Sequence, residues 1–263
     1  MRRLLVVTAR PQTIVGVIPA RMAASRFPGK PLALLCGRPM LEHVYRRAAC
    51  TAGFDAVYVA TPDQEIVDAA RQFGAPVVLT SPDHTRATDR VAEAARHFAA
   101  DVVVNVQGDE PLIAPEALDL LCEAMRDDPT LACANLVNAI TSDDDFRNPN
   151  QIKIVCDPAG NVLYMSRQPI PTGGSMRLRQ LGIIALRRDL LEAFAALPPT
   201  PLEAAESIDV LRLIEHGFRV RAIVSQSESF GVDTVEDLHV AERLLMSDPL
   251  TQKWLAGRGS IGP

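Results

Sequence analysis

Short apolar runs of strand length alternate with helix-patterned segments over the first 135 residues of this chain. The apolar runs are Ile14–Pro19, Ala56–Ala60, Pro76–Leu79 and Asp101–Val106; the helical patterns cover residues 41–51, 63–73 and 88–98, and another begins at Pro115. A strand–helix–strand order of this kind predicts a parallel sheet with helices on both faces, joined by right-handed crossovers. The nearly continuous apolar run before Gln107 is typical of a strand covered on both sides. We therefore predict a doubly wound, mostly parallel α/β fold.

The pattern changes beyond residue 146. Two β-rich pieces, Ile152–Cys156 and Val162–Ser166, are joined by a Pro- and Gly-containing turn that predicts a hairpin. A further apolar strand is expected over Leu181–Leu186. We expect a small β-rich excursion at about residues 146–186, inserted into one domain that spans residues 14–246.

The remaining elements complete this single domain. Helices are expected at Asp189–Leu197, Glu203–His216 and Val235–Met246, and a strand at Val220–Val224. Thr234 and Asp237 have the spacing of a capping box at the start of the last helix. Residues 1–13 are expected to form an N-terminal extension, and residues 247–263, which are rich in Gly and polar residues, a mobile tail.

Charge and cysteine usage exclude several classes of protein. The chain has 263 residues with 27 Lys and Arg against 32 Asp and Glu, a net charge of -5. This argues against a nucleic-acid partner and an anionic membrane surface. No apolar run approaches the roughly 18 residues that span a bilayer, and the start lacks the features of a signal peptide. Five scattered cysteines without a C-x-x-C pair suit a reducing compartment. We expect a cytoplasmic protein without a membrane span.

A basic loop follows the first strand. Arg21, Arg26 and Lys30 lie within ten residues, and Pro28, Gly29 and Pro31 fix the course of the loop. Several cations at the carboxyl end of a strand suit a polyphosphate, whose oxygens need many donors. The alternative is a solvated basic loop. The loop matches neither a Walker A motif nor G-x-G-x-x-G, so the usual motif support for P-loop hydrolysis or nicotinamide chemistry is missing.

Two aspartates are the best candidates for a metal site. Asp109 follows the strand that ends at Val106, and Gly108 beside it allows a ligand to approach the backbone. Asp233 precedes the last helix, where a carboxylate can simply stabilise the helix N-terminus. Mg²⁺ needs only one or two carboxylates when substrate phosphates supply the other ligands. Together with the basic loop, the two aspartates favour a metal–triphosphate site.

Three blocks of sequence now show a resemblance. They are PARMAASRFPGKPL at 19–32, NVQGDEP at 105–111 and GVDTVEDL at 231–238, with further matches at 146–150, 164–167, 181–183 and 200–206. In this order they resemble the CTP-dependent cytidylyltransferases, and most of all the 3-deoxy-manno-octulosonate (CMP-Kdo synthetase) family. The similarity covers about residues 14–246 and implies a Rossmann-like nucleotidyltransferase fold. It also implies a homodimer formed through the β-rich excursion.

The resemblance also implies roles for matching residues. Nucleotide contacts fall on Ala20, Arg21, Ser25, Arg26, Lys30, Thr88, Arg90, Gln107 and Gly108. Acceptor contacts fall on Arg86, Gln107, Arg167, Gln180, Glu206 and Asp209. Arg21, Lys30, Asp109 and Asp233 would be catalytic, with Mg²⁺ held by the two aspartates. The implied reaction is attack of an acceptor hydroxyl on the α-phosphorus of CTP, with loss of pyrophosphate.

Departures from the family pattern gather on the acceptor side. The usual R-H-L-G is R-Q-L-G at 179–182, the usual E-Q-L-R is D-V-L-R at 209–212, and an S-G pair is replaced by Arg86-Ala87. The acceptor is therefore open between 3-deoxy-manno-octulosonate, or a related 2-keto sugar acid, and another acid such as a phosphonate. A non-catalytic nucleotide-binding homologue is the alternative from another class. Among the histidines, only His84 stands in a loop after a strand, where it can touch substrate.

Overall fold

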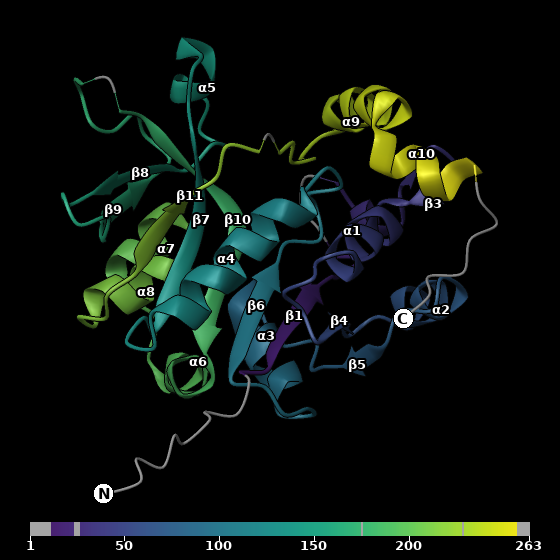
Figure 1. Cartoon of the computed structure of the whole chain (residues 1–263), viewed down its shortest axis with the longest axis horizontal. Coiled ribbons are helices and arrows are strands. Elements are labelled where there is room, and N and C mark those ends of the chain that lie inside the picture. The colour runs from purple at the N-terminus through teal and green to yellow at the C-terminus, as the bar shows by residue number, and fades with distance from the viewer. Residues whose placement is uncertain (1–11, 24–26, 175, 228, 257–263) are drawn as a thin grey trace, which may run out of the picture.

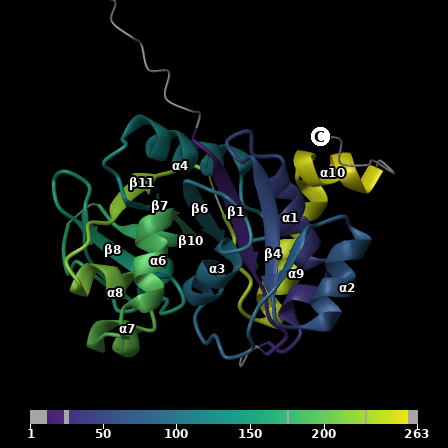
Figure 2. The same ribbon diagram turned by 90° about the horizontal axis from the view of Figure 1, so that it is seen from below.

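A mixed sheet forms the centre of the molecule, and helices cover both of its faces (Figures 1 and 2). The computed structural model describes residues 12–23, 27–174, 176–227 and 229–256. Seven strands of this sheet follow the order β11-β7-β10-β6-β1-β4-β5, and β8 and β9 extend it beside β10. The doubly wound, mostly parallel fold expected from the sequence is thereby confirmed.

The elements have the following bounds. The strands are β1 Ile14–Pro19, β2 Leu34–Leu35, β3 Arg38–Pro39, β4 Ala56–Thr61, β5 Val77–Leu79, β6 Val102–Val106, β7 Cys133–Ala139, β8 Lys153–Cys156, β9 Val162–Ser166, β10 Leu178–Arg187 and β11 Arg221–Val224. The helices are η1 Lys30–Leu32, α1 Met40–Ala49, α2 Gln64–Gln72, α3 Ala87–Ala95, α4 Pro115–Asp127, α5 Asp143–Arg147, α6 Arg188–Ala196, α7 Pro201–Glu206, α8 Val210–Glu215, α9 Val235–Ser247 and α10 Pro249–Ala256.

Strand β1 lies at the centre of the parallel part of the sheet. It pairs in parallel with both β4 and β6, so that Val17 lies between Tyr58 and Asn105. Ile14 and Ile18 pack into the core on one face of the sheet, whereas Val15 and Val17 pack into the core on the other. This alternation is the period of two expected of a strand. Because β1, β4, β5 and β6 run in parallel, the loops that follow them gather at one edge of the sheet.

The β-rich excursion differs from expectation in its last strand. The predicted hairpin is present as β8 and β9. Leu181–Leu186, however, belongs to β10, a ten-residue strand that pairs antiparallel with both β6 and β7 in the middle of the sheet. The physical reason is burial. Ile183, Ala185 and Leu186 are almost completely buried, and a strand at the exposed edge of a sheet could not bury them this far.

Two helical segments also differ from expectation. The helix expected over Glu203–His216 is split into α7 and α8, because Ser207 adopts a left-handed conformation (φ +55°) that ends α7. Residues 249–256, expected in the mobile tail, form α10. The reason is the side chain of Trp254, which is 8% exposed and lies 5.7 Å from the Arg47 guanidinium of α1.

The capping box of Thr234 and Asp237 is confirmed at α9. No helix within the described ranges combines the length and the hydropathy that crossing a membrane requires.

A buried ion pair joins α7 to α8 and gives a first prediction. Arg212 donates to both carboxylate oxygens of Glu203, at 2.8 and 2.6 Å, and the two side chains are at most 4% exposed. Replacement of Arg212 by Met leaves a buried carboxylate without the cation that donates to both of its oxygens, and only the more distant Arg86 remains nearby. We therefore expect a loss of about 3–5 kcal/mol in the free energy of unfolding. Urea denaturation measures this loss. The control Arg71→Met removes an exposed pair with Asp68 and should cost less than about 0.5 kcal/mol.

The same pair should make stability depend on pH. Burial alone raises the pKa of Glu203, but hydrogen bonds from Arg212 and from the Thr200 amide outweigh burial and hold this pKa below its usual range. A carboxyl with a lowered folded pKa stabilises the protein above its unfolded pKa, and the contribution is lost as the pH falls. The difference between wild type and Arg212→Met should therefore shrink as the pH falls, first where Glu203 becomes protonated in the variant and fully where it becomes protonated in the wild type. A difference that stays constant down to the acid transition would contradict this explanation.

Candidate active site

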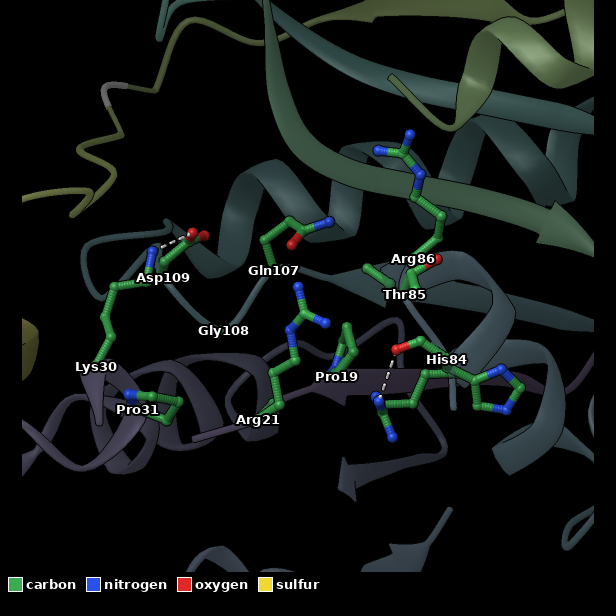
Figure 3. A pocket seen from close by; sticks show the side chains of 13 residues that line it. Pro19, Arg21, Lys30, Pro31, His84, Thr85, Arg86, Gln107, Gly108 and Asp109 are labelled. Atoms are coloured by element: carbon green, nitrogen blue, oxygen red, sulfur yellow. Dashed lines mark hydrogen bonds and ion pairs between the residues drawn. The ribbon is translucent and has the colours of Figure 1, made fainter. Parts of the chain in front are cut away.

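A cavity of about 230 Å³ lies where the loops after β1 and β6 meet the loop between β5 and α3 (Figure 3). We call it the strand-end pocket. Its lining residues are Pro19, Ala20, Arg21, Lys30, Pro31, His84, Thr85, Arg86, Ala87, Arg90, Gln107, Gly108 and Asp109. Four of these residues carry a positive charge and only one is an acid. The carboxyl edge of a parallel sheet is the usual ligand site of such folds, and its electrostatics here favour an anion.

Lys30 occupies the most constrained position at the strand-end pocket. Its ammonium donates to Asp109 Oδ2 at 2.7 Å and to the carbonyl oxygen of Val232 at 2.8 Å, and lies 3.6 Å from Asp233 Oδ1. Gly29 takes φ +75° immediately before η1, a conformation that favours glycine, and so lets the chain turn into the short helix that carries Lys30. One cation therefore holds together three segments that are far apart in the sequence.

Asp109 and Asp233 converge on this ammonium from two elements. Asp109 follows β6, and its carbonyl oxygen accepts from the Val232 amide at 2.9 Å. Asp233 directly precedes the N-cap of α9, and its own amide donates to Asp237 at 3.0 Å. No group of three or more His, Cys, Asp or Glu side chains with a metal-binding arrangement occurs among the residues that the structure describes. Two carboxylate donors fit a Mg²⁺ ion whose remaining ligands come from phosphate oxygens and water.

The backbone around the strand-end pocket is tightly packed. A Cβ on Gly108 would lie 3.1 Å from the carbonyl oxygen of Pro19, so any other residue would push the β6 loop away from the end of β1 by a few tenths of an ångström. Gln107 and Ala20 both line the pocket, and Arg21 extends toward Gln107 (Figure 3). The nucleotide contacts expected at Ala20, Gln107 and Gly108 thus fall on one continuous surface.

Arg90 lines the strand-end pocket but is largely engaged by the protein itself. It is 3% exposed, and its guanidinium donates to Thr80 Oγ1 at 2.6 Å and to the carbonyl oxygens of Ser81 and His84 at 3.0 and 3.2 Å. Burial, and then the charge of Arg21, lower its pKa. Arg90 therefore shapes the loop that carries His84, Thr85 and Arg86.

Thr88 was expected to contact the nucleotide and His84 to be able to touch substrate, but both side chains are bound by other groups of the protein. Thr88 is buried behind the lining residues, and its hydroxyl donates to Asp209 Oδ2 at 3.0 Å. His84 lines the strand-end pocket, but its ring lies 2.5 Å from Glu93 Oε2 and points away from Arg21 (Figure 3). Ser25 and Arg26, also expected at the nucleotide, lie outside the described residues.

The expected acceptor residues fall into two groups. Arg86 and Gln107 line the strand-end pocket, and Asp209 is joined to it through Thr88 and through Arg86, whose Nε lies 3.9 Å from Asp209 Oδ1. Burial raises the pKa of Asp209. The other three are Arg167, Gln180 and Glu206, and none of them is among the lining residues.

Glu206 and Arg167 are bound to each other. The Glu206 carboxylate accepts from Ser166 Oγ at 2.6 Å, from the Arg167 amide at 2.9 Å and from the Tyr164 hydroxyl at 3.1 Å. Arg167 Nε donates to the carbonyl oxygen of Glu206 at 2.8 Å. Burial alone raises the pKa of Glu206, but these hydrogen bonds outweigh burial and lower it. The cluster joins β9 to α7.

A buried polar group that the sequence patterns did not indicate lies next to the strand-end pocket. Glu110 is 9% exposed and accepts hydrogen bonds from Ser229 Oγ and from the Gly182 amide. Burial raises its pKa. Asn135, fully buried in β7, was also missed. An asparagine inside an apolar strand such as Ala134–Val137 is a signal that could have identified it, because buried amides need partners.

Comparisons with known proteins identify relatives of this chain. The family model described as Cytidylyltransferase matches residues 15–228. A 3-deoxy-manno-octulosonate cytidylyltransferase of Pelobacter propionicus is 44% identical over 240 residues, which cover 86% of this chain and 94% of the relative. The enzyme of the same name from Anaeromyxobacter sp. is 47% identical over 243 residues, covering 90% and 98%.

Solved structures point the same way. A CMP:2-keto-3-deoxy-manno-octonic acid synthetase complexed with CTP superposes with a TM-score of 0.84 at 40% identity, covering 89% of this chain and 98% of the other. A cytidylyltransferase from Leptospira borgpetersenii, at 18% identity and a TM-score of 0.64, covers 90% of this chain and 88% of its own. This second likeness concerns the fold alone.

Proposed function

Since this chain belongs to the cytidylyltransferase family, we propose that it transfers CMP from CTP to 3-deoxy-manno-octulosonate and releases pyrophosphate. The observation that carries the proposal is the position of the Lys30 ammonium, within 3.6 Å of both Asp109 and Asp233 at the edge of a cationic cavity. A triphosphate with a bound cation needs this combination of charges. The relatives of this name and the CTP complex described above support the choice of substrates.

The chemistry follows from the charges at the strand-end pocket. A hydroxyl oxygen of the acceptor attacks the α-phosphorus of CTP in line. The bond from this phosphorus to the bridging oxygen breaks, pyrophosphate leaves, and the hydroxyl proton passes to solvent. No side chain has to act as a nucleophile. Arg21 and Lys30 neutralise phosphate oxygens, and the rigid loops around Gly108 hold the reactants in line.

We propose Mg²⁺ as the cofactor, held by Asp109 and Asp233. When bound, it supplies charge neutralisation at the phosphates and lowers the pKa of a coordinated hydroxyl. Lys30 then has a second role. With no metal bound, its ammonium keeps the two carboxylates close together despite their mutual repulsion.

We assign the acceptor carboxylate to Arg86. Its Nε lies 3.7 Å from Glu203 and 3.9 Å from Asp209, and both carboxylates form shorter bonds with other groups. Within the described part of the chain the guanidinium makes no hydrogen bond of 3.5 Å or less, and Arg86 lines the strand-end pocket. In Figure 3 it lies on the opposite side of Gln107 from the Lys30–Asp109 pair, which separates an acceptor end from a triphosphate end.

Replacement of Arg86 by Gln tests this assignment. Loss of a charge-assisted contact of about 1.5–3 kcal/mol should raise the KM for the acceptor roughly 10- to 100-fold, while the KM for CTP stays within about twofold. Steady-state assays of pyrophosphate release measure both constants. The control Arg96→Gln removes an exposed arginine just beyond the end of α3. Equal changes in both KM values would disprove the assignment.

The position of Arg86 also favours a second candidate acceptor. A guanidinium at the acceptor end suits any small acid, including a phosphonate. Turnover with CTP and a panel of 2-keto sugar acids and phosphonates separates these candidates. We expect 3-deoxy-manno-octulosonate to give the highest kcat/KM, and its exclusive use would refute the phosphonate. Release of no pyrophosphate with any acceptor, despite CTP binding, would instead indicate a non-catalytic nucleotide-binding homologue.

A further inference from the structure

A hydrogen-bonded network behind the strand-end pocket joins the two segments that carry the aspartates. Glu110 directly follows Asp109, and its Oε2 accepts from the hydroxyl of Ser229, which lies four residues before Asp233. Two further bonds reinforce the connection: the Val232 amide donates to Asp109, and Lys30 donates to the Val232 carbonyl. The positions of Asp109 and Asp233 are therefore fixed relative to each other by more than Lys30.

The second oxygen of Glu110 reaches an irregularity in β10. The pairing of β10 with β7 shifts register between Gln180 and Ile184, and Gly182 lies inside this bulge. Its amide is free to turn away from the sheet and donates to Glu110 Oε1 at 3.3 Å. A Cβ on Gly182 would lie 2.3 Å from Gln107 Cγ, so the bulge also forms the surface on which Gln107 rests.

The bulge itself is stabilised from behind. The side-chain amide of Asn135, fully buried in β7, donates to the carbonyl oxygens of Leu181 at 3.2 Å and Ile183 at 3.0 Å. Arg179, at the other end of the bulge, donates to the carbonyl oxygen of Ser229 at 3.0 Å. Bulges of this kind redirect side chains beside active sites.

We propose that Glu110 is a positioning residue for the transfer reaction: its carboxylate, held by Ser229 and Gly182, sets where Asp109, Asp233 and Gln107 stand relative to one another. The proposal rests on the function proposed above. Glu110 does not line the strand-end pocket. It acts by connecting the loop that carries Asp109 to strand β10. Small displacements of this connection should lower the rate, because transfer depends on the alignment of the acceptor hydroxyl with the α-phosphorus.

The test compares Glu110→Ala, Glu110→Gln and Ser229→Ala with the wild type. The first readout is Mn²⁺ affinity in the presence of CTP and without acceptor, measured by electron paramagnetic resonance. We expect Glu110→Ala to weaken Mn²⁺ binding about tenfold and to lower kcat about 100-fold. Glu110→Gln keeps an acceptor for Gly182 and a partner for Ser229, and should stay within threefold of wild type in both. Ser229→Ala removes one of the two hydrogen bonds to the Glu110 carboxylate. Its Mn²⁺ affinity and kcat should lie between those of Glu110→Ala and Glu110→Gln.

Asp119→Ala is the matched control for lost stability. Its carboxylate accepts from the Gly53 amide at 2.6 Å, before the start of β4 and so at the opposite end of the strands. It should lower the Tm without changing Mn²⁺ affinity. The proposal is overturned if Ser229→Ala and Glu110→Ala bind Mn²⁺ as the wild type does, or if Glu110→Gln is as impaired as Glu110→Ala. The Mn²⁺ readout needs no acceptor, so an inactive wild type that binds CTP refutes the proposed function while still testing Glu110.

Discussion

Asp109→Asn should lower kcat by about 10²–10³-fold while leaving the fold intact. The change keeps the shape of the side chain but removes the charge that would bind the metal and orient Lys30. The magnitude is that of removing one preorganised electrostatic group from an active site, about 2.7–4 kcal/mol. Pyrophosphate release gives kcat, and circular dichroism with a thermal melt gives the state of the fold.

The fold should tolerate this change because Asp109 is partly exposed. A third of its side chain is accessible, and Lys30 retains the carbonyl oxygen of Val232 at 2.8 Å and Asp233 at 3.6 Å. The matched control is Asp101→Asn at the opposite end of β6. Its carboxylate accepts from the Thr13 amide at 2.8 Å, far along the strand from the strand-end pocket. Activity in Asp109→Asn equal to that of the control would remove Asp109 from the proposed mechanism.

Lys30→Met should lower kcat/KM for CTP by a similar factor, for a different reason. It removes a cation expected on the phosphates and leaves Asp109 and Asp233 without the ammonium that holds them together. We therefore expect the KM for CTP to rise together with a fall in kcat, whereas Asp109→Asn acts mainly on kcat. Initial rates over a matrix of CTP and acceptor concentrations distinguish the two patterns.

Lys30→Arg provides the control for charge. A guanidinium restores the positive charge, but its planar fork does not reproduce the three directions in which the ammonium meets Asp109, Val232 and Asp233. We expect partial recovery of the KM for CTP with little recovery of kcat. Full recovery of both constants would show that charge alone matters and that the geometry around Lys30 does not.

Binding of Mn²⁺ without nucleotide offers a separate measurement on Lys30. In the wild type the ammonium competes with a metal ion for the same two carboxylates. Lys30→Met should therefore bind Mn²⁺ alone more tightly than the wild type, even though its turnover is lower. Weaker binding would mean that Lys30 organises the carboxylates more than it competes for them.

Local patterns in the sequence were enough to predict most single elements. The hydrophobic periodicity gave β1 and β6 to within a residue, Pro115 gave the start of α4, and the capping box placed the start of α9. The same patterns placed Arg21, Lys30 and Asp109 after strands of a parallel sheet. The structure puts all three on one cavity. These predictions work because burial period, capping and strand order depend on neighbours that are close in the chain.

Other features depend on which distant segments meet, and only the tertiary structure decided them. The antiparallel insertion of β10 between β6 and β7, the packing of α10 through Trp254 on α1, and the Glu203–Arg212 pair all join segments whose separate patterns do not specify a partner. The family resemblance assigned Arg167 and Glu206 to the acceptor, but in the structure their polar groups hydrogen-bond to each other. The chain thus encodes its layers and its charged loops locally. Which donors remain available to a ligand is settled only when every buried polar group has found its partner.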